Sequence, residues 1–189
     1  MWRCSLLFVI FAVSAAAKAD GSERERLARG ETIVQIDETK EGGPALARVT
    51  GIINAPPEKV WTLIDRCSEY RRFLPRVSGS EELSRAGDQV RCRVVIDTPW
   101  PLSDLTSVTR ATHVVSPTLY KRSWTLESGD YLVNEGSWTL TPYEGGRTLA
   151  VYEIRSQLRQ DIPAFVRDLV QRRAMPEMME ALRRQSAKP

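Results

Sequence analysis

Residues 53–64 read INAPPEKVWTLI and mark a change from strand to helix. Proline costs little in the first turn of a helix, because its missing N–H group has no helical partner there. Glu58 suits the positive end of the helix dipole. Apolar side chains then recur at helical spacing, at Val60, Trp61, Leu63 and Ile64. The stretch therefore predicts a strand that ends near Ile53 and a helix over residues 57–66.

A β-hairpin is expected before this junction. Residues 32–37 alternate in polarity, residues 45–53 are rich in β-branched side chains, and KEGGP at 40–44 forms the turn between them. A second short helix is predicted over residues 70–74, where Pro75 ends it. The first part of the domain is thus a hairpin followed by two short helices.

The middle of the chain has the pattern of consecutive β-strands. Strands are predicted over residues 81–85, 89–98, 105–115, 119–127, 132–141 and 147–158. Short turn signals separate them, such as Gly87-Asp88 and Glu144-Gly145-Gly146. Turns at such short intervals indicate antiparallel neighbours.

The chain ends in a helical pattern with one apolar stripe. Its members are Ile162, Phe165, Val166, Leu169, Val170, Met175, Met178, Met179 and Leu182. Pro176 should kink or break this helix. A strongly twisted antiparallel sheet can curl around such a helix and leave an apolar pocket between the two. The predicted fold class is α+β: a curved antiparallel sheet wrapped around a long C-terminal helix, with two short helices after the N-terminal hairpin.

The first 19 residues have the organisation of a signal peptide. A charged start, Met1-Trp2-Arg3, precedes an apolar run over residues 4–17 and the small-x-small sequence Ala17-Lys18-Ala19. The run is shorter than the roughly 20 residues that a membrane-spanning helix needs. We expect cleavage after Ala19 and a periplasmic or secreted protein, with an uncleaved anchor as the alternative. Residues 20–30 are polar and predict a flexible lead-in to a domain over 31–187.

Charge and cysteine content narrow the function classes. Loss of residues 1–19 lowers the formal net charge from +3 to +1, because that segment holds Arg3 and Lys18 and no acid. A near-neutral chain has no electrostatic footprint for nucleic acid. Cys67 and Cys92 then remain, and both a disulfide and two buried thiols are open interpretations. With the single His113 they show no metal-ligand spacing, so no metal site is predicted.

Four segments resemble the START-related superfamily (SRPBCC), which includes the polyketide cyclase/dehydrase and coenzyme Q-binding groups. They are residues 53–64, YRRFLPRV at 70–77, PWPLSD at 99–104 and NEGSW at 134–138. The resemblance covers residues 30–185 and implies the helix-grip fold, in which a sheet grips the C-terminal helix over a ligand cavity. In that fold the end of the first helix lies near the sheet, so a Cys67–Cys92 bridge is geometrically feasible. The superfamily is functionally broad, and the resemblance implies the pocket better than the ligand.

No catalytic constellation is visible in the sequence. It has no glycine-rich nucleotide loop and no nucleophile motif, and we expect neither catalytic residues nor a cofactor. His113 would point outward if Val108, Thr112 and Val114 point inward. It is therefore interpreted as a surface or structural residue rather than a general base.

Strand parity predicts an aromatic cavity wall and an apolar lid. The wall would comprise Tyr120, Trp124, Trp138 and Tyr152, and the lid Phe165, Leu169 and Met179. The small residues Gly136 and Ala150 share these strand faces and would leave room for a guest. Ordinary core packing is the alternative for the whole set.

Two further ligand-binding candidates each have an alternative. Arg122 shares a strand face with Tyr120 and Trp124, where it could meet a ligand carboxylate, carbonyl or head group; a one-residue bulge would instead turn it to solvent. Trp100, between two prolines, could line the cavity mouth, touch a membrane or pack over the sheet edge.

These features predict an exported binding or carrier protein for a hydrophobic small molecule or lipid. The alternatives are a cyclase-type enzyme that uses the same cavity and a ligand-free interaction module. The expected partners are the hydrophobic ligand and a transient membrane contact, and no nucleic acid. The sequence does not determine the oligomeric state.

Overall fold

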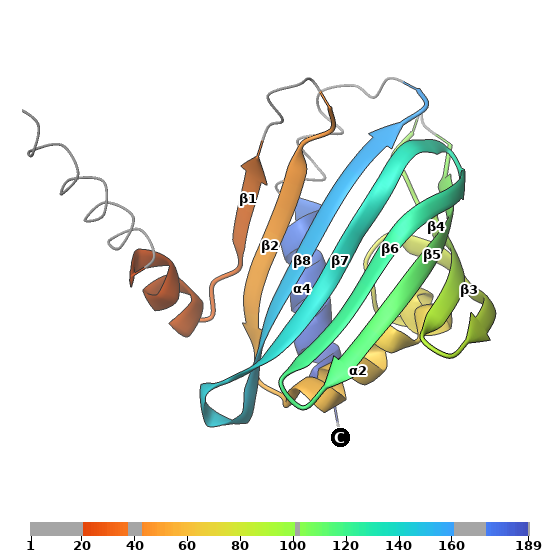
Figure 1. Cartoon of the computed structure of the whole chain (residues 1–189). Helices are drawn as coiled ribbons and strands as arrows, with labels where there is room; N and C mark the ends of the chain where they lie inside the picture. The colour runs from red at the N-terminus through yellow and green to blue at the C-terminus, as the bar shows by residue number, and fades with distance from the viewer. Residues whose placement is uncertain (1–20, 38–42, 101–102, 161–172, 189) are drawn as a thin grey trace, which may run out of the picture.

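The computed structural model describes residues 21–37, 43–100, 103–160 and 173–188, and a curved eight-stranded antiparallel sheet dominates them (Figure 1). The strands are β1 (Ile33–Asp37), β2 (Leu46–Ile53), β3 (Val77–Ala86), β4 (Gln89–Ile96), β5 (Leu105–Ser116), β6 (Leu119–Gly129), β7 (Tyr131–Tyr143) and β8 (Arg147–Leu158). The helices are α2 (Pro57–Asp65), η1 (Cys67–Arg72), η2 (Glu144–Gly146) and α4 (Met175–Ser186).

The strand order is β1-β2-β8-β7-β6-β5-β4-β3. Strands β3 to β7 each pair with the next strand along the chain, as the closely spaced turn signals predict. The segment of α2 and η1 connects β2 to β3, which lies at the far edge of the sheet. This crossing places α2 at the lower end of the sheet in Figure 1 and η1 against β3 and β4.

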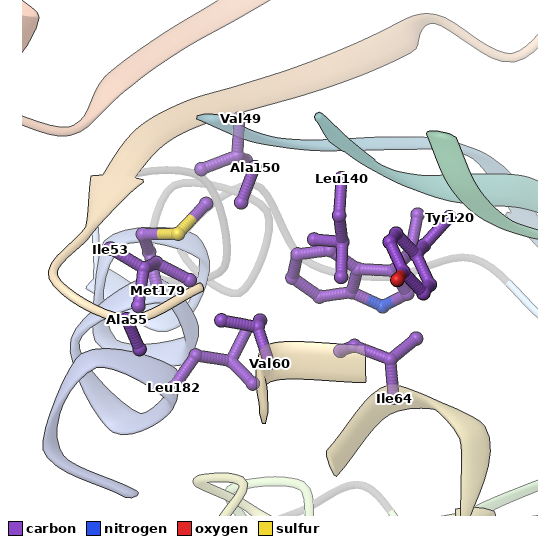
Figure 2. Packing of buried hydrophobic residues seen from close by; sticks show 11 residues of the cluster. Val49, Ile53, Ala55, Val60, Ile64, Tyr120, Leu140, Ala150, Met179 and Leu182 are labelled. Atoms are coloured by element: carbon purple, nitrogen blue, oxygen red, sulfur yellow. The ribbon is translucent and has the colours of Figure 1, made fainter. Parts of the chain in front are cut away.

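The predicted helix-grip fold is confirmed, because α4 lies behind the curved sheet and packs on it (Figure 1). Met179 and Leu182 of α4 are fully buried with Val49 and Ile53 of β2. Figure 2 shows this core, in which Val60 of α2 points between the sheet and α4. Each such apolar side chain stabilises the fold by roughly 1.5–3 kcal/mol.

At the ends of the domain, one prediction differs from the structure, and the kink or break at Pro176 stays a prediction because residues 161–172 lie outside the described residues. Pro176 lies in the first turn of α4, where it is tolerated, and the π-helical residues 173–174 come just before it. Residues 21–28, predicted as a flexible lead-in, are helical. Leu27 of this helix is buried against Ile33 and Ile52, an apolar anchor that the sequence interpretation missed.

The predicted signal peptide, residues 1–19, lies outside the described residues. Within the described ranges, no helix has both the length and the apolar character needed to cross a membrane.

Candidate ligand-binding cavity

A cavity of about 710 Å³ lies between the concave face of the sheet, η1 and the start of α4. Every second side chain of a strand lines this cavity, because successive side chains point to opposite faces of the sheet. Strand β4 contributes Cys92, Val94 and Ile96, and β5 contributes Leu105, Ser107 and Thr109. Strand β8 contributes Tyr152, Ile154 and Ser156, and α4 contributes Met175 and Met178.

The inner end of the cavity is a row of side chains from adjacent strands. His113 of β5 pairs with Arg122 of β6, Arg122 with Trp138 of β7, and Trp138 with Tyr152 of β8. Arg122, Trp138 and Tyr152 line the cavity, whereas the next row toward α2, which includes Tyr120 and Leu140, belongs to the packed core. The cavity therefore ends where the helix α2 begins to fill the concave face.

Aromatic rings form a continuous wall along β6, β7 and β8. Trp138 and Tyr152 have ring centroids 4.7 Å apart, and Trp124 stacks on Tyr152 at 5.7 Å. The indole Nε1 of Trp124 donates a hydrogen bond to Asn134 Oδ1 at 3.0 Å. Burial raises the pKa of Tyr152, so this phenol stays neutral at physiological pH.

The small residues on these strands do not provide the open space, which corrects the prediction for Gly136 and Ala150. A Cβ atom at Gly136 would lie 2.6 Å from the Trp124 ring and 2.2 Å from the backbone oxygen of Glu153. The Trp124 ring therefore occupies the space that the glycine leaves. Ala150 is fully buried in the packed core. On β5, by contrast, the cavity wall includes the small polar residues Ser107 and Thr109.

A polar cluster closes the inner end behind the aromatic wall. Arg122 is only 2% exposed, and its Nη1 donates to His113 Nε2 at 2.6 Å. Arginine can only donate, so His113 Nε2 carries no proton and its Nδ1–H faces Asp65 Oδ1 at 3.1 Å. Asp65 also forms an ion pair with Arg85 at 2.8 Å. Burial, and secondly the charge of Arg122, lower the pKa of His113 to about 4.

This cluster corrects the expected outward direction of His113 and decides between the two interpretations of Arg122. His113 is buried and structural, because β5 turns Leu105, Ser107, Thr109, Ala111 and His113 inward rather than Val108, Thr112 and Val114. Arg122 also points inward, and no bulge turns it to solvent. The register shift in the β5–β6 pairing lies at Val108 and Thr109, further along the strands.

A disulfide joins Cys67 of η1 to Cys92 of β4, with 6.3 Å between the Cα atoms. Cys92 Sγ also lies 3.0 Å from Arg122 Nη2. In the chain-entropy model a loop of this length stabilises the fold by about 3 kcal/mol. The bridge fixes η1, and with it the cavity-lining Tyr70, against the sheet.

The structure brings together four of the predicted ligand-binding residues: Arg122, Trp124, Trp138 and Tyr152 all line the cavity. Tyr120 and Met179 are corrections, because both lie in the packed core. The hydroxyl of Tyr120 bonds to Glu58 Oε1 at 2.9 Å, and Met179 packs under Gly51. Trp100 is 89% exposed and lies beside the lining residue Pro99. Phe165 and Leu169 fall outside the described residues.

Some lining residues were not selected from the sequence. Met175, one helical turn before the buried Met179, and Met178, its direct neighbour, line the cavity. Ser107, Thr109 and Asn134 add polar groups. The signal for the methionines was present in the apolar stripe, but the sequence does not say which turn of the helix faces the cavity. Among the described residues, no group of three His, Cys, Asp or Glu side chains is arranged to hold a metal ion.

A curved antiparallel sheet that grips its C-terminal helix over an internal cavity defines the START-like helix-grip class of the SRPBCC superfamily. Residues 53–183 match the family described as polyketide cyclase / dehydrase and lipid transport, and the chain belongs to this family. Comparison with curated protein sequences gives no match.

Solved structures with the same fold include lipid-transfer proteins and a cyclase. A STAR-related lipid transfer protein from Xanthomonas axonopodis is 19% identical, with a TM-score of 0.72 over 83% of this chain and 94% of that chain. Human StAR-related lipid transfer protein 5 is 18% identical, with a TM-score of 0.66 over 90% and 92%. The Zhui aromatase/cyclase from Streptomyces sp. R1128 is 18% identical, with a TM-score of 0.54 over 75% and 86%. Fold and family together point to hydrophobic ligand binding or cyclase chemistry.

Proposed function

We propose that the protein is an exported carrier that holds a hydrophobic small molecule or lipid inside the helix-grip cavity. The observation that carries the proposal is the cavity of about 710 Å³ with its wall of Trp124, Trp138 and Tyr152. Small-molecule sites typically measure roughly 300–1,000 Å³ and are lined by aromatic and apolar side chains. Met175 and Met178 at the lid add adaptable contacts for an irregular guest.

Export rests on the N-terminal sequence and is supported by the Cys67–Cys92 disulfide. Disulfides persist in the periplasm and outside the cell, whereas reducing systems remove them in the cytosol. Under this proposal the mature protein begins at Asp20. N-terminal sequencing of the protein from its native host tests the point, and recovery of an intact cytoplasmic chain with Met1 would overturn it.

A transient membrane contact at the cavity mouth is supported by the loop around residue 100. The Trp100 side chain is 89% exposed, although its neighbour Pro99 lines the cavity. Tryptophan suits the boundary between water and an apolar phase. A ligand that leaves a bilayer at this point would enter the cavity directly.

The test of the carrier proposal is the identification of a bound molecule. The chain is purified from its native compartment without detergent, and native mass spectrometry is recorded before and after organic extraction. Untargeted lipidomics of the extract then identifies the guest. A mass that does not change on extraction, together with no uptake of hydrophobic molecules afterwards, would favour the ligand-free interaction module instead.

The cyclase alternative has one structural feature in its favour, because Arg122 and Tyr152 bring polar groups to the cavity surface. Against it, His113 lies behind Arg122 and does not line the cavity within the described part of the chain. Turnover of a cavity-sized polyketide, lost on substitution of Arg122 or Tyr152, would establish the enzyme.

A further inference from the structure

The inner end of the cavity holds a buried cation, Arg122, that bonds to only two side chains in the described part of the chain. A guanidinium has five N–H donors, and the side chain of Arg122 uses one on His113 Nε2 and directs another at Cys92 Sγ, a weak acceptor. No carboxylate in the described ranges forms an ion pair with Arg122. The carboxylate of Asp65 is connected to Arg122 through the His113 ring and is also bound to Arg85.

A buried cation with so few partners is costly unless something else satisfies it. Arg122 is 2% exposed and lines the cavity, so a molecule inside the cavity can reach it. The hydroxyls of Ser107 and Thr109 also line the cavity, on the neighbouring strand β5. Trp138 lies next to Arg122 on β7, and Tyr152 lies next to Trp138 on β8. The rest of the lining includes apolar side chains such as Val94, Ile154 and Met178 together with the charged Arg76 and Asp97. The cavity therefore offers a buried cation at its inner end and apolar side chains beyond it.

We infer that the ligand is an amphiphile with a carboxylate head, bound head-first so that the carboxylate pairs with Arg122 and the hydrocarbon part fills the cavity toward Met175 and Met178. The planar guanidinium matches a carboxylate with two parallel hydrogen bonds. A single buried cation suits one negative charge better than the doubly charged phosphate group. This inference rests on the proposed carrier function and specifies its ligand class.

His113 is the positioning residue of this site. Its Nε2 accepts from Arg122 while its Nδ1–H is held by Asp65, and the T-shaped contact with Trp61 at 5.0 Å fixes the ring. The guanidinium is thereby oriented before the ligand arrives. Pre-organisation of this kind lowers the entropic cost of binding.

The test compares three probes of equal chain length on the delipidated full chain: decanoate, decanol and methyl decanoate. Isothermal titration calorimetry at neutral pH should show decanoate binding at least tenfold tighter than the two neutral probes, as charge-assisted hydrogen bonds predict. The variant Arg122→Met keeps the side-chain length without the charge. It should lose this preference for decanoate while its affinity for decanol stays within about threefold of the parent's.

Two controls separate a specific effect from a structural one. Arg93→Met removes an exposed cation from the outer face of β4 and should leave the preference intact. Arg122→Lys keeps the charge without the planar fork and should retain part of the preference. If Arg122→Met does not fold, the comparison of probes on the parent protein and on Arg122→Lys still decides the matter.

The outcomes distinguish the two proposals. A parent protein that binds decanol as tightly as decanoate, or an Arg122→Met variant that keeps the preference, overturns the carboxylate inference and leaves the carrier function standing. A parent protein that binds none of the three probes contradicts both.

Discussion

His113 holds Arg122 through a ring nitrogen that must stay unprotonated. Protonation of Nε2 would place a second cation 2.6 Å from the guanidinium, in a site with little access to water. The protein therefore keeps this histidine neutral, and its pKa falls to about 4 from an ordinary 6.5. The protonation state of His113 therefore affects both the hydrogen bond that holds Arg122 at the inner end of the cavity and the stability of the fold.

Stability should decrease as the pH falls from 6.5 toward 4. The folded protein holds the pKa of His113 below its unfolded value, so the unfolded chain binds the proton first and protons favour unfolding in this window. The stabilisation is present above pH 6.5 and lost on approach to pH 4. Urea unfolding curves at intervals across this window measure the decrease.

His113→Gln is the matched variant, because it keeps a polar side chain but does not titrate. It should be less stable than the parent near neutral pH, and the difference should shrink as the pH approaches 4. A carboxylate whose pKa is lowered by arginine partners, such as Glu127, is present in both proteins, so the comparison removes its contribution. Parallel pH profiles for the two proteins would contradict the assignment to His113.

Strand β5 shows why the alternation of residues along a strand did not predict which face of that strand points inward. Val108 and Val114 have strong β propensity, but that propensity reflects fit to a pleated surface rather than a particular face. The open sheet leaves these valines on its outer face, and Val114 is 51% exposed. The inward positions instead hold Ser107 and Thr109, which face the cavity. A cavity-lining strand therefore lacks the usual contrast between an apolar core face and a polar surface.

Helix α4 is attached to the sheet by a close approach at Gly51 of β2. A Cβ atom there would lie 2.8 Å from Met179 Cγ and 2.9 Å from Arg183 Nη2. Arg183 also donates to the backbone oxygen of Ile52 and to Thr32 Oγ1, both at 2.9 Å. The helix position therefore depends on the absence of a side chain at residue 51.

Gly51→Ala should lower the free energy of unfolding by about 1–3 kcal/mol, because the added methyl group forces Met179 and Arg183 out of their packed positions. The shift should also weaken probe binding, since Met175 and Met178 precede Met179 on the same helix. Gly21→Ala is the control, because nothing lies within 4 Å of its added Cβ. Equal stability of Gly51→Ala and the parent in urea would show that α4 is not held at this contact.

At the scale of the whole molecule, the sequence predicted the fold better than the limits of the cavity. The order of elements follows from local signals: prolines at the start of α2, alternation in the strands and glycine-containing turns. The end of the cavity has no such local signal. Tyr120 and Arg122 share one face of β6, yet α2 covers the first and not the second. On α4, likewise, Met179 lies in the packed core and Met178 lines the cavity. The boundary between core and cavity depends on how the sheet, α2 and α4 meet, which no local sequence signal encodes.

The carrier function requires that the cavity stay empty of side chains, and Ser107 is the position at which to fill it. Its small side chain is buried and faces the cavity from β5. Ser107→Phe should place a ring inside the roughly 710 Å³ space with a stability change of about 1 kcal/mol or less, because room already exists there. Affinity for the neutral fluorescent probe N-phenylnaphthylamine should fall at least tenfold.

Val108→Phe tests the same enlargement on the opposite face of the same strand, and it should leave probe affinity within about twofold of the parent's. The pair therefore separates loss of cavity volume from a general effect of a bulky residue in β5. If Ser107→Phe loses about 1–3 kcal/mol of stability and the parent takes up no probe, side chains already fill the space in solution. The concave face would then act as a solid core, and the carrier function would have to be abandoned.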